Sequence, residues 1–275
     1  MRFPEGAERV ARACAESYPQ ARARAAAWLG LPATGTVALH LVEDHGALER
    51  VIGGRAPRWA VAVTRGDDVL ALRLDRVGSS PETSLETVLR HEAVHEVLNG
   101  LAHERLPAWF EEGLCVTFAG SPYLRVDSSV ERRAAGDALP SFAALDAAFQ
   151  GDDAAGAAFA YEAGRAAAAF FLARHGHDAL RALLGRLAAG ERFAEAFRAA
   201  TGGGVAEFEG AWRASVTPRL PFTLYVVLEN LDLALLFLGG LLLAAGFLRY
   251  RLRRRRALRA LGTGSEPEER GEEGG

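Results

Sequence analysis

The chain has 275 residues, of which 49% are apolar and 24% are charged, which is an ordinary balance for a globular protein. This length suits one sizeable core with a smaller addition, since domains usually span roughly 100 to 200 residues. The formal net charge of −3 gives no reason to expect nucleic acid as a partner, and two cysteines are too few for a disulfide framework.

The N-terminal part of the sequence contains one helix pattern and three strand patterns. Charges interrupt residues 1–30, which have no apolar run as long as a secretory signal needs, so we expect an amphipathic helix there. The alternating segment 37–42 predicts a strand. Segments 59–64 and 69–74 flank an Arg-Gly-Asp-Asp turn signal and predict a hairpin.

After these strands the pattern changes to helix. We expect a helix over residues 81–98, capped by Ser80 and stopped by Asn99 and Gly100, and a second helix over 107–118. Further segments have helical composition and are separated by Gly-rich breaks: 143–150, 159–175, 178–189, 192–200 and 205–216. Strands followed by helices indicate an α+β fold.

The C-terminal part has a different composition. Leu233–Leu248 contains no charge, and the arginine-rich segment 249–256 follows directly. At 1.5 Å per residue the apolar run reaches about 24 Å, short of a hydrocarbon core of about 30 Å, so a span also needs residues 221–231 and snorkelling arginines. We expect one transmembrane helix over residues 220–248, because the arginine cluster argues against a buried core helix.

The charges predict the orientation of this helix. The positive-inside rule places the Arg-rich and then acidic, disordered tail, residues 249–275, in the cytoplasm. The folded domain, residues 1–219, is then expected in the periplasm or outside the cell. The missing secretory signal conflicts with this placement, so either the true start lies upstream or the domain is exported in another way.

The segment 91–95, His-Glu-Ala-Val-His, is an HExxH motif in the first predicted long helix. Residues i and i+4 share a helix face, so His91 and His95 can bind one metal ion. Glu92 can reach a water at that metal without being a ligand, as metal-assisted hydrolysis requires. Two solvated helix histidines are the simple alternative, but the surrounding apolar stripe makes unpartnered polar groups costly.

A catalytic zinc site usually has a third protein ligand and an open fourth position. Leu98 and Leu101 occupy the Gly and last His positions of the pattern HExxHxxGxxH, which excludes that pattern, and His103 lies two positions too late for it. A carboxylate from the next predicted helix would complete a His₂Glu set. Helical periodicity does not choose between Glu111 and Glu112.

These motifs resemble those of the gluzincin zinc metallopeptidases, and specifically of the bacterial peptidase-MA-like group. Residues 106–113, Leu-Pro-Ala-Trp-Phe-Glu-Glu-Gly, are similar to the pattern P-x-W-[FL]-x-E-G that follows HExxH in that group. Similarity to the group's C-terminal helices continues through segments 161–165, 171–176, 193–202 and 208–212. The resemblance covers about residues 7–216.

The resemblance implies a zincin-like metallopeptidase domain over residues 1–219, with a small N-terminal mixed sheet, an active-site helix and a helical C-terminal part. It implies a peptide or protein substrate. In that group the Glu directly before Gly is the third ligand, which implies Glu112. The implied site is Zn²⁺ held by His91, His95 and Glu112, with Glu92 as the catalytic residue.

Two residues and two further functions remain as alternatives. Gluzincins often use a Tyr or His to donate a hydrogen bond to the oxyanion, so Tyr161 is either that donor or a packing aromatic. Cys115 is either a metal ligand or, more simply, a small buried residue. The chain is expected to be an active membrane-anchored peptidase, and the alternatives are an inactive binding module at the membrane and an adaptor whose arginines contact anionic lipid.

Overall fold

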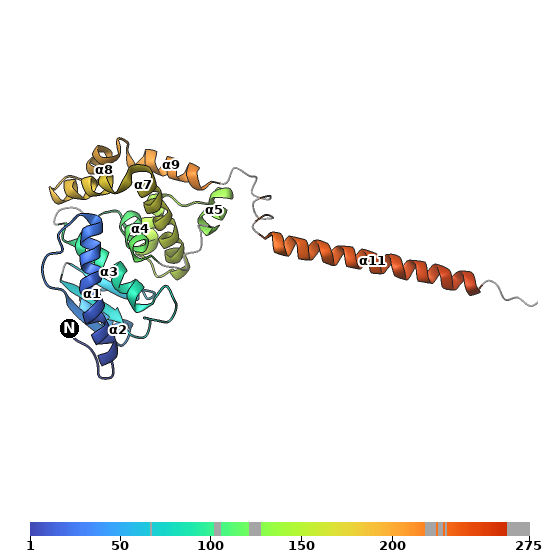
Figure 1. Ribbon diagram of the computed structural model, residues 1–275, viewed down its shortest axis with the longest axis horizontal. Helices are drawn as coiled ribbons and strands as arrows, with labels where there is room; N and C mark the ends of the chain where they lie inside the picture. The colour runs from blue at the N-terminus through green and yellow to red at the C-terminus, as the bar shows by residue number, and fades with distance from the viewer. Residues whose placement is uncertain are drawn as a thin grey trace, which may run out of the picture. The chain divides into compact units, whose positions relative to one another are not determined.

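The chain divides into two compact units, Met1–Arg219 and Leu220–Gly275. We describe them in a computed structural model (Figure 1). The structure describes residues 1–66, 68–101, 106–120, 128–217, 224, 228 and 230–262.

A small mixed sheet lies in the first unit. Its strands are β1 (Ala38–Val42), β2 (Ala62–Arg65) and β3 (Val69–Arg73), in the order β1-β3-β2. β1 runs parallel to β3 and β2 antiparallel to it, so the predicted hairpin and the predicted mixed sheet are confirmed. β2 begins later than predicted. Before it, the side chain of Arg73 donates to the carbonyls of Arg58 and Ala60 at 2.8 and 2.9 Å, so these two carbonyls are satisfied by a side chain and not by a neighbouring strand.

Helices make up most of the first unit. In chain order they are α1 (Glu8–Leu29), α2 (His45–Ile52), α3 (Leu85–Asn99), α4 (Ala108–Ala119), α5 (Ser128–Ala135), α6 (Phe142–Phe149), α7 (Ala154–Ala188), α8 (Phe193–Thr201) and α9 (Val205–Val216). The first unit is therefore mostly helical with a small sheet, which agrees with the predicted α+β fold.

Several helix boundaries differ from the prediction. α3 begins at Leu85 because Ser84 is its cap, and the Ser84 hydroxyl accepts from the Thr87 amide at 3.3 Å. The predicted cap, Ser80, instead belongs to the preceding turn. α2 and α5 were not predicted, and the two helices expected on either side of Gly176 form one run, α7, with a kink at that residue (φ 78°).

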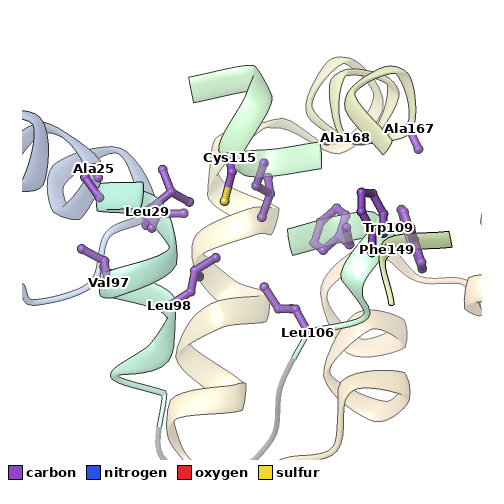
Figure 2. Close-up of a cluster of buried hydrophobic side chains, with 14 of the residues drawn as sticks. Ala25, Leu29, Val97, Leu98, Leu106, Trp109, Cys115, Phe149, Ala167 and Ala168 are labelled. Atoms are coloured by element: carbon purple, nitrogen blue, oxygen red, sulfur yellow. The ribbon is translucent and has the colours of Figure 1, made fainter. Parts of the chain in front are cut away.

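The core of the first unit joins α1, α3, α4 and α7. α1 packs along α3, and α4 packs along both α3 and α7. Figure 2 shows side chains of this core, among them Leu29 of α1, Leu98 of α3 and Cys115 of α4. Cys14 and Cys115 are both buried and free. The packing ties the helix that carries the HExxH motif to two neighbouring helices.

Two glycines lie where α4 and α7 cross. A Cβ added at Gly113 would lie 2.2 Å from the backbone oxygen of Gly164, and a Cβ at Gly164 would lie 2.7 Å from the backbone oxygen of Trp109. Since these obstacles are backbone atoms, a side chain at either position would push the helices apart. The glycine after Glu112 therefore permits the close approach that brings Tyr161, three residues before Gly164, toward α4.

The second unit contains one long helix, α11 (Leu231–Gly262). Its segment Leu231–Arg256 has a mean hydropathy of 2.2 and exposes its apolar side chains, for example Leu236 and Leu243. The helix is long and apolar enough to cross a membrane, and its assignment as a span stays a prediction. Residues 263–275, the end of the predicted tail, lie outside the described residues.

Candidate metal centre

The two motif histidines lie on one face of α3. Their ring centroids are 4.9 Å apart, and the Nε2 atoms of His91 and His95 are 3.1 Å apart. One turn of helix separates the two residues, so their rings converge on one point, as the i, i+4 spacing predicts.

The N-terminal half of α4 brings a carboxylate to the same point. Glu112 Oε2 lies 3.2 Å from His91 Nε2 and 3.4 Å from His95 Nε2. The start of α4 is held in place because the amide of Trp109 donates to Asp146 Oδ1 at 2.7 Å, and the Trp109 ring stacks on Phe142 with centroids 3.8 Å apart. The sequence Pro-x-Trp-x-x-Glu therefore combines an anchored helix start with a carboxylate that faces α3.

The three converging atoms fit a small divalent metal ion. Metal–ligand distances of 2.0 to 2.2 Å place the ligand atoms of a tetrahedral site about 3.3 to 3.6 Å apart, close to the 3.1, 3.2 and 3.4 Å that separate these atoms. Glu112 Oε2 is also buried without a hydrogen-bond partner of good geometry. A buried, unsatisfied carboxylate oxygen between two imidazole nitrogens is a favourable position for a cation.

The electrostatics of the cluster favour an ionised carboxylate. Burial raises the pKa of Glu112, but the neighbouring His95 and His91 outweigh burial and hold this pKa well below its usual range. Burial lowers the pKa of His95, but Cys115, Glu112 and Glu111 outweigh it and hold this pKa well above its usual value. Metal binding therefore has to displace a proton from the histidine, which links metal affinity to pH.

The two adjacent glutamates of α4 contact opposite sides of His95. Glu111 Oε1 lies 2.7 Å from His95 Nδ1, whereas Glu112 faces the Nε2 atoms of both histidines. Helical periodicity does not choose between the two as the third ligand, whereas the family resemblance implies Glu112. In the structure, Glu112 alone of the two contacts both His91 and His95.

Cys115 lies nearer the histidine pair than its sequence position indicated. Its sulfur and one nitrogen each of His91 and His95 lie within 4.8 Å of one another. Burial raises the pKa of the Cys115 thiol to about 12. Glu112 Oε2 lies 3.2 and 3.4 Å from the two Nε2 atoms and is buried without a hydrogen-bond partner among the described residues, so Glu112 is the better placed third ligand.

Glu92, the predicted catalytic residue, is only 5% exposed, and a residue of the sheet holds its carboxylate in place. The hydroxyl of Thr64, on β2, donates to Glu92 Oε2 at 2.7 Å. This contact joins residues that lie 28 positions apart, and no sequence pattern indicated it because Thr64 is an ordinary strand residue. This hydrogen bond uses Oε2 and does not involve Oε1, the second carboxylate oxygen of Glu92.

A cleft of about 450 Å³ opens beside the centre and includes His91, Glu92 and Tyr161 in its wall. Apolar residues from α3, α4 and the segment before β2 line much of it, among them Val88 and Val116. The Tyr161 ring lies 6.0 Å from the His91 ring between centroids, and burial raises the pKa of Tyr161 well above its usual value. A neutral phenol at this position can donate a hydrogen bond to a bound substrate.

A partly buried ion pair joins α1 to α3. Arg22 Nε donates to Glu96 Oε2 at 2.7 Å and Arg22 Nη2 donates to Glu96 Oε1 at 2.9 Å. Sequence reasoning missed this pair, although a glutamate directly after His95 within an apolar stripe was a possible signal. His103, a less favoured candidate for the third ligand, lies outside the described residues.

The comparison with known protein families concerns the part of the chain that follows the sheet. A family model described as the peptidase MA superfamily matches residues 82–218, which include the HExxH motif, Glu112 and Tyr161. No curated protein and no solved structure matches the chain. The three strands lie before residue 82, outside the range that the family model matches, so the contact of Thr64 with Glu92 is known from the structure alone. Through residues 82–218 the chain therefore belongs to the peptidase MA superfamily of gluzincin-like metallopeptidases.

Proposed function

We propose that this chain is a membrane-anchored, zinc-dependent peptidase that hydrolyses peptide bonds. Residues 1–219 form the metallopeptidase domain of zincin-like fold, and His91, His95 and Glu112 hold Zn²⁺. The observation that carries the proposal is the meeting of three ligand atoms within 3.4 Å of one another, with the oxygen of Glu112 buried and unsatisfied. Two imidazoles and one carboxylate are a ligand set of zinc hydrolases, with a fourth position left for water or substrate.

Each side chain has a distinct role in this proposal. When bound, zinc would acidify a water molecule and polarise the carbonyl of the scissile bond. Glu92 takes the proton of the attacking water and later gives it to the leaving amine. Tyr161 donates a hydrogen bond to the oxyanion that develops on the carbonyl oxygen. The apolar cleft beside His91 binds the peptide and excludes water from it.

The metal content of the purified chain tests the proposed ligands. We expect about one zinc per chain, and we expect Glu112→Gln to weaken zinc binding more than about 100-fold, because it removes a charged ligand and not only a supporting contact. Zinc affinity should also fall as the pH falls, since His95 has to lose its proton. Metal analysis and competition with a chelator measure both effects.

The matched control is Glu86→Gln. Glu86 lies on α3, its side chain is 70% exposed, and it pairs with Arg90 away from the centre. This variant should bind zinc as the unchanged chain does. A folded chain without affinity for zinc would disprove the proposed function and leave a peptidase-like binding module as the alternative.

The proposal also places the chain in the membrane. Residues 220–248 are the transmembrane segment and residues 249–275 are the cytoplasmic tail, so that the metallopeptidase domain lies in the periplasm or outside the cell. The apolar helix α11 and the arginines at its C-terminal end support this orientation. The enzyme would then bind its peptide or protein substrates on that side of the membrane.

Protease accessibility tests the orientation. Protease added to intact cells with a permeable outer layer should degrade the domain of residues 1–219 and spare an epitope placed after Arg259, because arginine clusters resist translocation. Lysed cells are the control, in which both parts should be cut. Protection of the domain and loss of the epitope in intact cells would instead describe a cytoplasmic enzyme held by a tail anchor.

A further inference from the structure

The two adjacent carboxylates of α4 form different contacts with the same histidine. Glu111 Oε1 lies 2.7 Å from His95 Nδ1, and Glu112 Oε2 lies 3.4 Å from His95 Nε2. The two side chains of His95 and Glu111 are 15% and 18% exposed, so their contact is largely shielded from water. Glu111 therefore has a defined partner within the centre and is not a solvated helix residue.

We propose that Glu111 is a positioning residue that orients His95 for the metal. An ionised carboxylate can only accept a hydrogen bond, so Nδ1 of His95 has to donate it. When His95 binds a metal it is neutral and carries one N–H, which leaves the lone pair on Nε2, the atom that lies 3.1 Å from His91 Nε2. The contact with Glu111 thus selects the tautomer and ring orientation that a metal at this point requires.

The position of α4 makes this arrangement possible. The helix start is anchored at Trp109 by Asp146, so the backbone of the next turn, with Glu111 and Glu112, is held against α3. Successive helix residues point about 100° apart, so one of two neighbouring carboxylates can contact Nδ1 of His95 while the other contacts Nε2. The proposal rests on the proposed zinc site, but it concerns how tightly that site binds and not whether it exists.

Zinc affinity of the full-length chain tests the role of Glu111. We expect Glu111→Ala to weaken zinc binding by roughly 10- to 100-fold, as loss of a carboxylate behind a ligating histidine does in other sites. Glu111→Gln keeps an amide oxygen that accepts from Nδ1, so its loss should be smaller than that of the alanine variant. Chelator competition measures the affinities, and Glu86→Gln, with its exposed side chain, is the control.

Thermal unfolding of the metal-free variants separates positioning from a general structural role. We expect Glu111→Gln to unfold, without metal, at the temperature of the unchanged chain, so that its altered zinc affinity reports on the centre alone. Unchanged zinc affinity in both Glu111 variants would overturn the proposal. Loss of all zinc in Glu111→Gln together with retention in Glu112→Gln would also overturn it and make Glu111 the ligand. An unchanged chain that binds no zinc would instead disprove the proposed function itself.

Discussion

Glu92→Gln should abolish measurable hydrolysis while the chain keeps its zinc. The substitution removes the general base and keeps the size and shape of the side chain, and a general base contributes typically 10²- to 10⁴-fold to the rate. The amide oxygen of the substituted side chain can still accept from the Thr64 hydroxyl, which lies 2.7 Å from the present carboxylate oxygen, so the side chain should stay in place. The expected loss is therefore in kcat and not in metal content.

Digestion of a mixed peptide library, followed by mass spectrometry, measures this effect without knowledge of the natural substrate. Glu86→Gln is the matched control, because it makes the same chemical change on the same helix at an exposed position. Loss of zinc from Glu92→Gln would show that Glu92 has a structural role. Undiminished cleavage by this variant would remove it from the mechanism.

Arg22→Ala should destabilise the first unit by about 1 to 3 kcal/mol, because the buried carboxylate of Glu96 loses its charged hydrogen-bond partner while water reaches the partly exposed position of Arg22. Glu96, its partner, is only 2% exposed and accepts two hydrogen bonds from the guanidinium. Glu96 directly follows His95 on α3, so we expect the loss of its partner to affect the metal centre as well. Arg90→Ala, which removes an exposed i, i+4 pair with Glu86, should cost less than about 0.5 kcal/mol.

Denaturant unfolding followed by tryptophan fluorescence reports on the first unit, because all four tryptophans lie within residues 1–219. The double variant Arg22→Met with Glu96→Met removes both charges and should recover much of the lost stability, since apolar residues often replace a buried pair at little cost. Equal stability of Arg22→Ala and Arg90→Ala would contradict the prediction and assign the Arg22 pair no more weight than a surface pair.

Local patterns in the sequence were sufficient for the elements that depend on neighbouring residues. The strands of the hairpin, the end of α3 at Asn99 and the start of α4 after Pro107 follow from turn signals, stop signals and the fixed φ of proline. The unpredicted α2 also had such a signal, because Asp44 caps it by accepting from the Ala47 amide at 2.7 Å and Gly53 ends it. Its eight residues were too short for a clear helical period.

The sequence by itself determined the pair His91 and His95, since a helix places residues four apart on one face whatever surrounds it. Its motifs also indicated the family, and the family model matches residues 82–218 of the resemblance drawn over about residues 7–216. Helical periodicity left Glu111 and Glu112 open, and the family resemblance implied Glu112. Only the tertiary structure shows that Glu112 contacts both histidines, because this depends on how α4 crosses α3. The same holds for Thr64 and Arg22, whose partners lie 28 and 74 residues away. Such contacts depend on packing between elements, which no local period in the sequence encodes.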